Sequence, residues 1–267
     1  MAVEKFADKT LTEYSRCVAA ADGLPGGGSV IALCGSCASA LGLMVTNLSR
    51  GKASCAQYAD DIEKCSKALE TLRVYMLHLV DEDIKAFAPL AKYAPMDKSD
   101  PETMSHYQAS LRLACAIPTE VMYKMTECAE YLGVLAEKGC IGALSDAGIA
   151  LHLCKAIMEG ARLTCLANAR CLQDEVYAMT VAREFEIVFK ENMPKIDSAI
   201  KTVEQRLTRW APLSCGALPR LRRSKPRRLT FAPLSPSRRC WPLSAPAARL
   251  TIWPMKRASA APAPNAA

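Results

Sequence analysis

A glycine-rich turn that leads into a long apolar segment constrains the fold more than any other stretch of the chain. Gly26, Gly27 and Gly28 lie between a proline and Ser29, and residues 30–48 that follow are almost all apolar or small. Consecutive glycines are costly inside a regular element, so they belong where the backbone turns sharply or approaches another group closely. Ser29 has the position and chemistry of a helix N-cap. The sequence therefore predicts a tight turn followed by a helix of about five turns.

The turn at 25–29 has two interpretations that the turn alone does not separate. A glycine loop at a helix start presents free backbone N–H groups and the positive end of the helix dipole, which suits an anion or a polarised carbonyl. The alternative is a helix–helix turn that binds nothing. The sequence here matches neither G-x-G-x-x-G nor G-x-x-x-x-G-K-[ST]. The nucleotide-binding motifs therefore lack their defining spacing.

The apolar segment 30–48 is close to the length that spans a membrane. It contains Ser36, Ser39, Thr46 and Asn47, and it is rich in small residues rather than in Leu and Ile. Small side chains let neighbouring backbones approach closely. We therefore expect a buried, closely packed helix and no membrane span.

Helical patterns cover most of the remaining chain up to residue 206. Capping signals and apolar residues at helical spacing predict further helices over residues 11–20, 58–93, 101–138, 145–172 and 174–206. No segment combines strand alternation with hairpin turns. The predicted fold class is all-α, a bundle of about six helices, some of them long. Two apolar helices rich in small residues are more than one short chain usually buries alone, so we expect a homodimer.

The composition changes abruptly after residue 206. Residues 207–267 hold twelve of the 34 Lys and Arg residues, ten of the 16 prolines, all three tryptophans and none of the 27 acidic residues. Residues 1–206 therefore carry 22 basic and 27 acidic side chains, and the net charge of +7 comes from the tail. We expect a helical domain over 1–206, a disordered basic tail over 207–267, and no nucleic-acid partner. A tail that does bind nucleic acid would show a steep salt dependence.

The cysteines indicate a reducing compartment. Eleven of the 13 lie within the helical patterns, and the N-terminal residues do not resemble a secretory signal, so we expect reduced thiols in a cytoplasmic protein. Cys34 and Cys37 form a C-x-x-C pair. A zinc site would need a second pair or suitably spaced histidines, and neither is near. We expect both thiols to be small core residues, and no metal site.

Two carboxylates are candidates for catalysis. Asp83 falls on the apolar stripe of the helix predicted over 58–93, and a buried acid needs a partner or a role. Its neighbours Asp81 and Glu82 are expected to face solvent. Asp146 stands at a helix start, where stabilisation of the helix by its charge is the alternative to catalysis.

Two further polar residues are candidates for ligand binding. Asn168 lies in an apolar helix, where it would bind a ligand or a neighbouring backbone group. Lys52 follows the apolar helix and is either a surface charge or a carboxylate-binding group. His78, His106 and His152 are far apart in the sequence and match no metal or triad pattern.

Blocks of residues in a characteristic order resemble the cyclodeaminase/cyclohydrolase family. That family includes the C-terminal domain of formiminotransferase-cyclodeaminase and the bacterial methenyltetrahydrofolate cyclohydrolases. The blocks are PGGGSV at 25–30, RGK at 50–52, DEDIKAF at 81–87, SDAGIA at 145–150, and EGA at 159–161 followed by Asn168. The resemblance covers residues 10–206, and the tail has no counterpart.

The resemblance implies an all-helical dimer that binds a tetrahydrofolate derivative and makes or breaks the one-carbon bridge between N5 and N10. The resemblance is compatible with two activities, methenyltetrahydrofolate cyclohydrolase and formiminotetrahydrofolate cyclodeaminase. Both pass through a tetrahedral carbon with nitrogen leaving groups. Such chemistry requires proton transfer and positioning, and needs no metal or redox cofactor.

The resemblance also implies roles for particular residues. Asp83 and Asp146, provided that they converge, would stabilise the cationic amidinium and transfer protons. The expected substrate-binding residues contact the folate through backbone N–H groups or polar side chains: Gly26, Gly27, Gly28, Ser29, Lys52 and Asn168. The alternative function, from a different class, is a non-catalytic helical dimer that binds a folate-like ligand. Separation of the two carboxylates, in one subunit and across the dimer, would favour that alternative.

Overall fold

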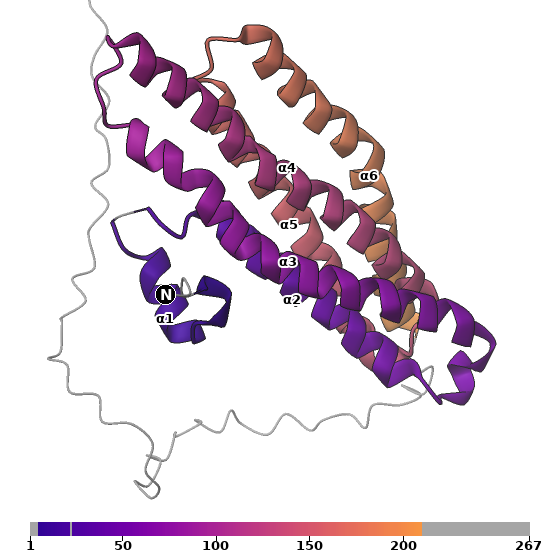
Figure 1. Ribbon diagram of the computed structural model, residues 1–267. Helices are drawn as coiled ribbons and strands as arrows, with labels where there is room; N and C mark the ends of the chain where they lie inside the picture. The colour runs from indigo at the N-terminus through magenta and orange to yellow at the C-terminus, as the bar shows by residue number, and fades with distance from the viewer. Residues whose placement is uncertain (1–4, 22, 210–267) are drawn as a thin grey trace, which may run out of the picture. The chain divides into compact units, whose positions relative to one another are not determined.

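The computed structural model describes residues 5–21 and 23–209, and every regular element in these ranges is a helix (Figure 1). Five long helices form a bundle: α2 (Gly27–Ser49), α3 (Ala59–Tyr93), α4 (Pro101–Lys138), α5 (Leu144–Ala169) and α6 (Glu175–Arg209). The short elements are η1 (Phe6–Asp8), α1 (Leu11–Val18), η2 (Ala53–Tyr58) and η3 (Ile141–Ala143), where η denotes a 3₁₀ helix. The all-α prediction is confirmed.

The element boundaries lie close to those expected from the capping signals. Thr10 and Glu13 form a capping box at the start of α1, and the Asp100 carboxylate accepts from the Thr103 N–H at the start of α4. α4 continues through Pro118 as one helix. The last helix ends at Arg209, three residues beyond the predicted domain boundary. The predicted tail, apart from residues 207–209, lies outside the described residues.

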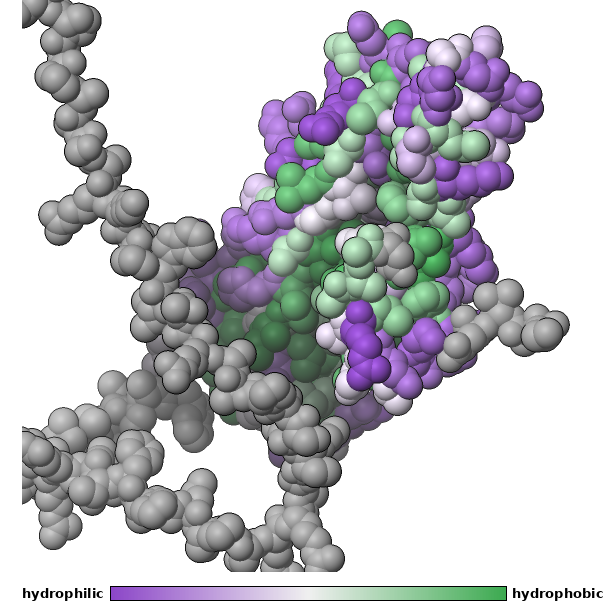
Figure 2. All heavy atoms as spheres, turned by 90° about the vertical axis from the view of Figure 1, so that its left-hand side faces the viewer, coloured by the Kyte–Doolittle hydropathy of each residue, from purple (hydrophilic) through white to green (hydrophobic). Residues whose placement is uncertain are grey.

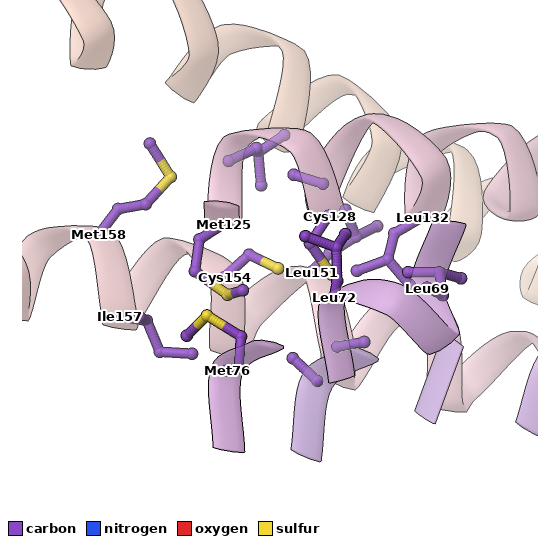
Figure 3. Packing of buried hydrophobic residues seen from close by; sticks show 14 of the residues in the cluster. Leu69, Leu72, Met76, Met125, Cys128, Leu132, Leu151, Cys154, Ile157 and Met158 are labelled. Carbon is purple, nitrogen blue, oxygen red and sulfur yellow. The ribbon is translucent and has the colours of Figure 1, made fainter. Parts of the chain in front are cut away.

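α2, α3, α4 and α5 each pack against the next, and α5 closes the ring against α2, while α6 covers α4 and α5. Small residues in α2 allow this close approach. A Cβ added at Gly35 would lie 2.2 Å from Met76 Cε, and one added at Gly42 would lie 2.8 Å from Leu69 Cδ1. Figure 3 shows this core, where buried side chains of α3, α4 and α5 interdigitate, among them Leu69, Met76, Met125 and Leu151. The predicted close packing of segment 30–48 is confirmed.

α2 is buried on only part of its circumference. It and the segment 141–169 are long and apolar enough to cross a membrane, and half of each apolar window is buried inside the bundle. The rest of α2 presents a stripe of apolar side chains at helical spacing, here called the α2 stripe: Val30, Leu33, Cys34, Cys37, Leu41, Met44 and Leu48. Figure 2 views the side on which α1 lies in Figure 1, and apolar side chains form a continuous area there.

The prediction that Cys37 is a core residue was wrong, whereas Cys34 is partly buried and packs against the core. Both lie on the α2 stripe, which residues 5–21 and 23–209 leave partly uncovered, so Cys34 is half-buried and Cys37 is exposed. All eleven cysteines in the described part of the chain are free thiols.

Arg206 joins the end of α6 to the end of α4. Its guanidinium donates to the carbonyl oxygens of Ala136 at 2.6 Å and Gly139 at 2.8 Å. These carbonyls belong to a helix end, where acceptors lack partners within their own helix and a cation is favourable.

Replacing this side chain should destabilise the bundle measurably. We expect Arg206→Ala to lower the free energy of unfolding by about 1–3 kcal/mol, because two charge-assisted hydrogen bonds are lost. Urea unfolding followed by circular dichroism measures the change. Arg209→Ala, at an exposed arginine of the same turn, is the control and should leave the midpoint unchanged. Equal effects of the two substitutions would contradict this role for Arg206.

Candidate active site

The Asp83 carboxyl group lies against the first turn of α2. Its side chain is buried, with an exposed fraction of 7%. A Cβ added at Gly28 would lie 2.0 Å from Asp83 Oδ1 and 2.5 Å from Cγ, so only a glycine leaves room for the carboxyl group. The backbone N–H of Ser29 donates a hydrogen bond to the carboxylate. The predicted burial of Asp83 is confirmed.

Asp83 supplies a cap that α2 does not provide for itself. The N-cap residue of α2 is Gly26 and not Ser29 as predicted, and Gly26 has no side chain to accept from the first-turn N–H groups. The carboxylate comes instead from α3, and its negative charge lies at the positive end of the α2 dipole. Gly26, Gly27, Gly28 and Ser29 therefore form a helix start built around a carboxylate. The close approach required at Gly28 explains one of the three glycines directly.

Burial and capping act on the Asp83 pKa in opposite directions. Removal from water raises the pKa of this carboxyl to about 6, and the Ser29 N–H hydrogen bond lowers it by less. Desolvation has the larger effect on this pKa, because the buried surroundings disfavour the ionised carboxylate. A carboxyl group with a pKa of about 6 is mostly ionised at neutral pH and is close to the range in which a general base is most effective.

Two residues of the N-terminal segment reach this site. The hydroxyl of Tyr14, on α1, lies 2.8 Å from Ser29 Oγ, and burial raises the pKa of the Tyr14 phenol. The backbone N–H of Phe6 donates to Asp81 Oδ1 at 2.6 Å. The sequence predicted the α1 helix from its capping box, but no pattern indicated what Tyr14 would contact.

The prediction that Asp81 faces solvent was wrong. Its exposed fraction is 9%, because η1 packs over it. Glu82 lies nearer the surface and pairs with Lys85 at 2.7 Å.

Asp146 lies at the other end of α2 from Asp83. It is half-buried in the first turn of α5. The Cys140 N–H donates to Ser49 Oγ at 2.9 Å, which places the start of α5 beside the end of α2. At 1.5 Å per residue, the two ends of α2 are roughly 30 Å apart. The two carboxylates therefore do not converge within one chain. The joint catalytic role expected for Asp83 and Asp146 required that they converge.

Lys52 lies at the Asp146 end and lines a cavity of about 560 Å³. The cavity is formed by the end of α2, by η2 and by the first turn of α3, and its lining includes Arg50, Asp60 and Glu63. Arg50 is engaged by Glu63 at 2.9 Å. Lys52 is exposed and has no ion pair among residues 5–21 and 23–209, so it is the cation available to a ligand there.

Asn168 lies toward the Asp83 end of the bundle. Gly160, two turns earlier on α5, packs against Ile31 near the start of α2. The Asn168 side chain is half-buried and donates to the Ala114 carbonyl oxygen at 3.4 Å. Its amide therefore binds a neighbouring backbone, one of the two roles considered for it. In the part of the chain that is described, no three His, Cys, Asp or Glu side chains are grouped to share a metal ion.

Known proteins are similar to this chain in sequence and in fold. The family model for formiminotransferase-cyclodeaminase matches residues 10–187. The methenyltetrahydrofolate cyclohydrolase of Methylorubrum extorquens is 26% identical over 204 residues, which cover 75% of this chain and 98% of that protein. The formimidoyltransferase-cyclodeaminase of Gallus gallus is 28% identical over 173 residues, 63% of this chain but 32% of that protein. The chain thus spans about a third of the animal enzyme.

A solved structure has the same fold. The crystal structure of formiminotetrahydrofolate cyclodeaminase from Thermotoga maritima aligns with a TM-score of 0.64 and 27% identity, over 75% of this chain and 96% of that one. The likeness puts this bundle in the class of all-helical proteins represented by that structure. With two thirds of its length matched by the family model, the chain belongs to the formiminotransferase-cyclodeaminase family.

Proposed function

We propose that this protein is a folate one-carbon enzyme that opens or closes the N5–C–N10 bridge of tetrahydrofolate, with methenyltetrahydrofolate cyclohydrolase as its activity. The observation that carries the proposal is the buried Asp83 carboxyl at the start of α2, with a pKa raised to about 6. The match to nearly the full length of a cyclohydrolase supports the choice of reaction.

The proposed chemistry requires one proton acceptor beside the methenyl carbon. As a water oxygen adds to that carbon, the Asp83 carboxylate accepts a proton from the water. The neutral tetrahedral adduct then breaks its C–N5 bond, N5 gains a proton, the hydroxyl loses one, and 10-formyl-tetrahydrofolate results. The proton held by Asp83 passes to solvent. A base with a pKa near neutrality suits this step, which needs no metal or redox cofactor.

Formiminotetrahydrofolate cyclodeaminase is the second candidate activity, and the solved structure with the same fold supports it. In that reaction N10 attacks the formimino carbon and loses a proton, and the departing nitrogen gains two protons, one passed on from N10 and one from solvent, and leaves as ammonia. The same carboxyl group would accept the N10 proton. Both candidates fit a reduced, cytoplasmic protein, and the free thiols agree with that location.

We further propose that the protein is a homodimer that buries the α2 stripe. A helix that is apolar around its whole circumference is normally buried on all sides, but the part of the chain that the structure describes covers only part of α2. The stripe has no charged residue from Val30 to Leu48. A second copy of the same stripe is the partner that matches its small and apolar side chains.

A twofold dimer would also resolve the separation of the two carboxylates. When the twofold axis is perpendicular to α2, the two copies of α2 run antiparallel. The start of one α2 then faces the end of the other, so Lys52 of the partner subunit and Asp146 of the partner subunit lie on the side of Asp83. Lys52 would then meet the glutamate tail of a folate bound at Asp83.

A charge on the α2 stripe should separate the subunits. We expect Met44→Glu to convert a dimer into a monomer, because two buried glutamates would face an apolar surface without partners. Light scattering coupled to size exclusion measures the mass. The control is Val176→Glu, at a residue 77% exposed on α6, which should stay dimeric. A wild-type monomer would contradict the proposed dimer.

The function is tested by supplying each substrate to the purified full-length chain. Loss of the methenyl absorbance well above the spontaneous rate would support the cyclohydrolase. Formation of that absorbance from 5-formimino-tetrahydrofolate, with release of ammonia, would instead support the cyclodeaminase. A folded protein that binds the folate but turns over neither compound would favour the non-catalytic alternative.

A further inference from the structure

The N-terminal segment 5–18 is fastened to the bundle beside Asp83. Two hydrogen bonds attach it, one from the Phe6 N–H to Asp81 Oδ1 at 2.6 Å and one between the Tyr14 hydroxyl and Ser29 Oγ at 2.8 Å. They join residues 75 and 15 positions apart in the sequence. Both reach the two elements that form the site, since Asp81 lies two residues before Asp83 on α3 and the Ser29 N–H on α2 donates to the Asp83 carboxylate.

Few residues of the segment are buried, although Phe6 and Ala7 pack partly buried against the core. Tyr14 is the only buried residue of α1, and η1 has none. Leu11 is 78% exposed, and Val18 is also exposed. A short helix with few buried contacts has a low free energy of local opening. The two hydrogen bonds, the buried Tyr14 ring and the partly buried Phe6 and Ala7 therefore hold this segment in place.

We propose that segment 5–18 is a strap over the Asp83 corner, the place where Asp83 on α3 meets the first turn of α2. Tyr14 and Asp81 are the positioning residues that hold this strap closed. Neither residue is assigned a chemical step. The docked strap keeps water from the Asp83 carboxyl group. It also orders the first turn of α2, where the Ser29 N–H donates to that carboxyl group. Its effect on turnover rests on the proposed function, whereas its docking does not.

The strap also brings a titratable group, the Tyr14 phenol, close to the titratable groups of the site. Burial has the largest effect in raising the Tyr14 pKa, and Asp83 and Asp81 from α3 and Cys34 from α2 each lie close enough to Tyr14 on α1 for their charges to raise it further. Undocking the strap would rehydrate this corner. The Asp83 carboxyl would then ionise more easily, because desolvation is the larger influence on it.

Removal of the Asp81 acceptor tests the strap. In Asp81→Ala, trypsin should cleave after Arg16 at least 10-fold faster than in the wild type, and kcat should fall about 10-fold. The dependence of stability on pH between about 4 and 6 should also shrink. Asp81→Asn keeps an acceptor oxygen for the Phe6 N–H and should restore wild-type behaviour. Glu82→Ala, at the adjacent carboxylate that pairs with Lys85, is the matched control and should change none of these.

A second variant tests whether the effects of Asp81→Ala come from undocking of the strap or from a wider disturbance of the fold. Tyr14→Phe keeps the buried ring and removes only the hydroxyl, so it should also speed cleavage after Arg16, by several fold. Wild-type cleavage rates in both Asp81→Ala and Tyr14→Phe would overturn the strap, as would faster cleavage with an unchanged pH dependence of stability. If the wild type turns over neither folate while these two readouts change as expected, the proposed function fails and the strap stands.

Discussion

Asp83→Asn should abolish most turnover while leaving the bundle folded. The asparagine amide oxygen can still accept from the Ser29 N–H, so the cap on α2 survives, but an amide cannot accept a proton at neutral pH. We expect the rate to fall by about 10²–10⁴-fold, the usual contribution of a positioned general base. Single-turnover loss of the methenyl absorbance, or ammonia release from the formimino substrate, measures the change.

The same variant should be more stable at neutral pH. The Asp83 pKa is about 6 in the folded protein and 3.8 in the reference state, so the folded state binds the proton more tightly. The stability that this group contributes is therefore full below about pH 4 and is lost as pH rises through 6. The difference corresponds to roughly 3 kcal/mol. Asp83→Asn lacks this dependence and should unfold at a higher urea concentration than the wild type at pH 7.

Glu82→Gln provides the control for this substitution, since it neutralises the neighbouring carboxylate at the protein surface. It should keep wild-type turnover and the wild-type pH dependence of stability. Near-full activity of Asp83→Asn would remove Asp83 from the mechanism and would leave capping of α2 as its only role.

Gly28→Ala should damage both the fold and the site. The new methyl group would lie 2.0 Å from Asp83 Oδ1, far inside contact distance, and the short Asp83 side chain cannot move away without breaking its hydrogen bond to the Ser29 N–H. We expect a loss of about 1–3 kcal/mol in stability, typical of overpacking. Turnover should fall at least 10-fold, because the carboxyl group is displaced. Urea unfolding and the folate assay measure the two effects.

Gly27→Ala is a control of the same chemical size one residue earlier. A Cβ at Gly27 meets nothing within 4 Å, and the position is exposed in the first turn of α2. Alanine is favoured over glycine in a helix by up to about 1 kcal/mol, so this variant should be as stable as the wild type or slightly more stable. If both alanines are tolerated equally, the close packing of Gly28 on Asp83 is wrong.

Periodicity and capping signals predicted the helices well because those signals are local. The capping box at Thr10 and the aspartate at position 100 begin helices where expected. The apolar stripe of α3 correctly indicated that Asp83 is buried, since an i, i+3, i+4 pattern determines which side of a helix faces the core. The family resemblance, carried by blocks in order, then agreed with the family match.

The errors concern residues whose surroundings come from distant parts of the chain. Asp81 was assigned to solvent because no local pattern shows that η1 folds back over it. Cys37 was assigned to the core because an apolar helix gives no indication of which face its own chain leaves open. The separation of Asp83 and Asp146 depends on the direction of α2 between them. Spacing along the sequence cannot supply these tertiary contacts.

The pH dependence of turnover tests the central claim most directly, namely that the Asp83 carboxylate accepts the proton. The single-turnover rate of the full-length wild type would be measured from pH 4.5 to pH 8 and corrected for the spontaneous reaction at each pH. We expect a rate that is low below pH 5, rises through an apparent pKa of about 6, and is level near neutrality. A rate that does not change across this range in the wild type would contradict it.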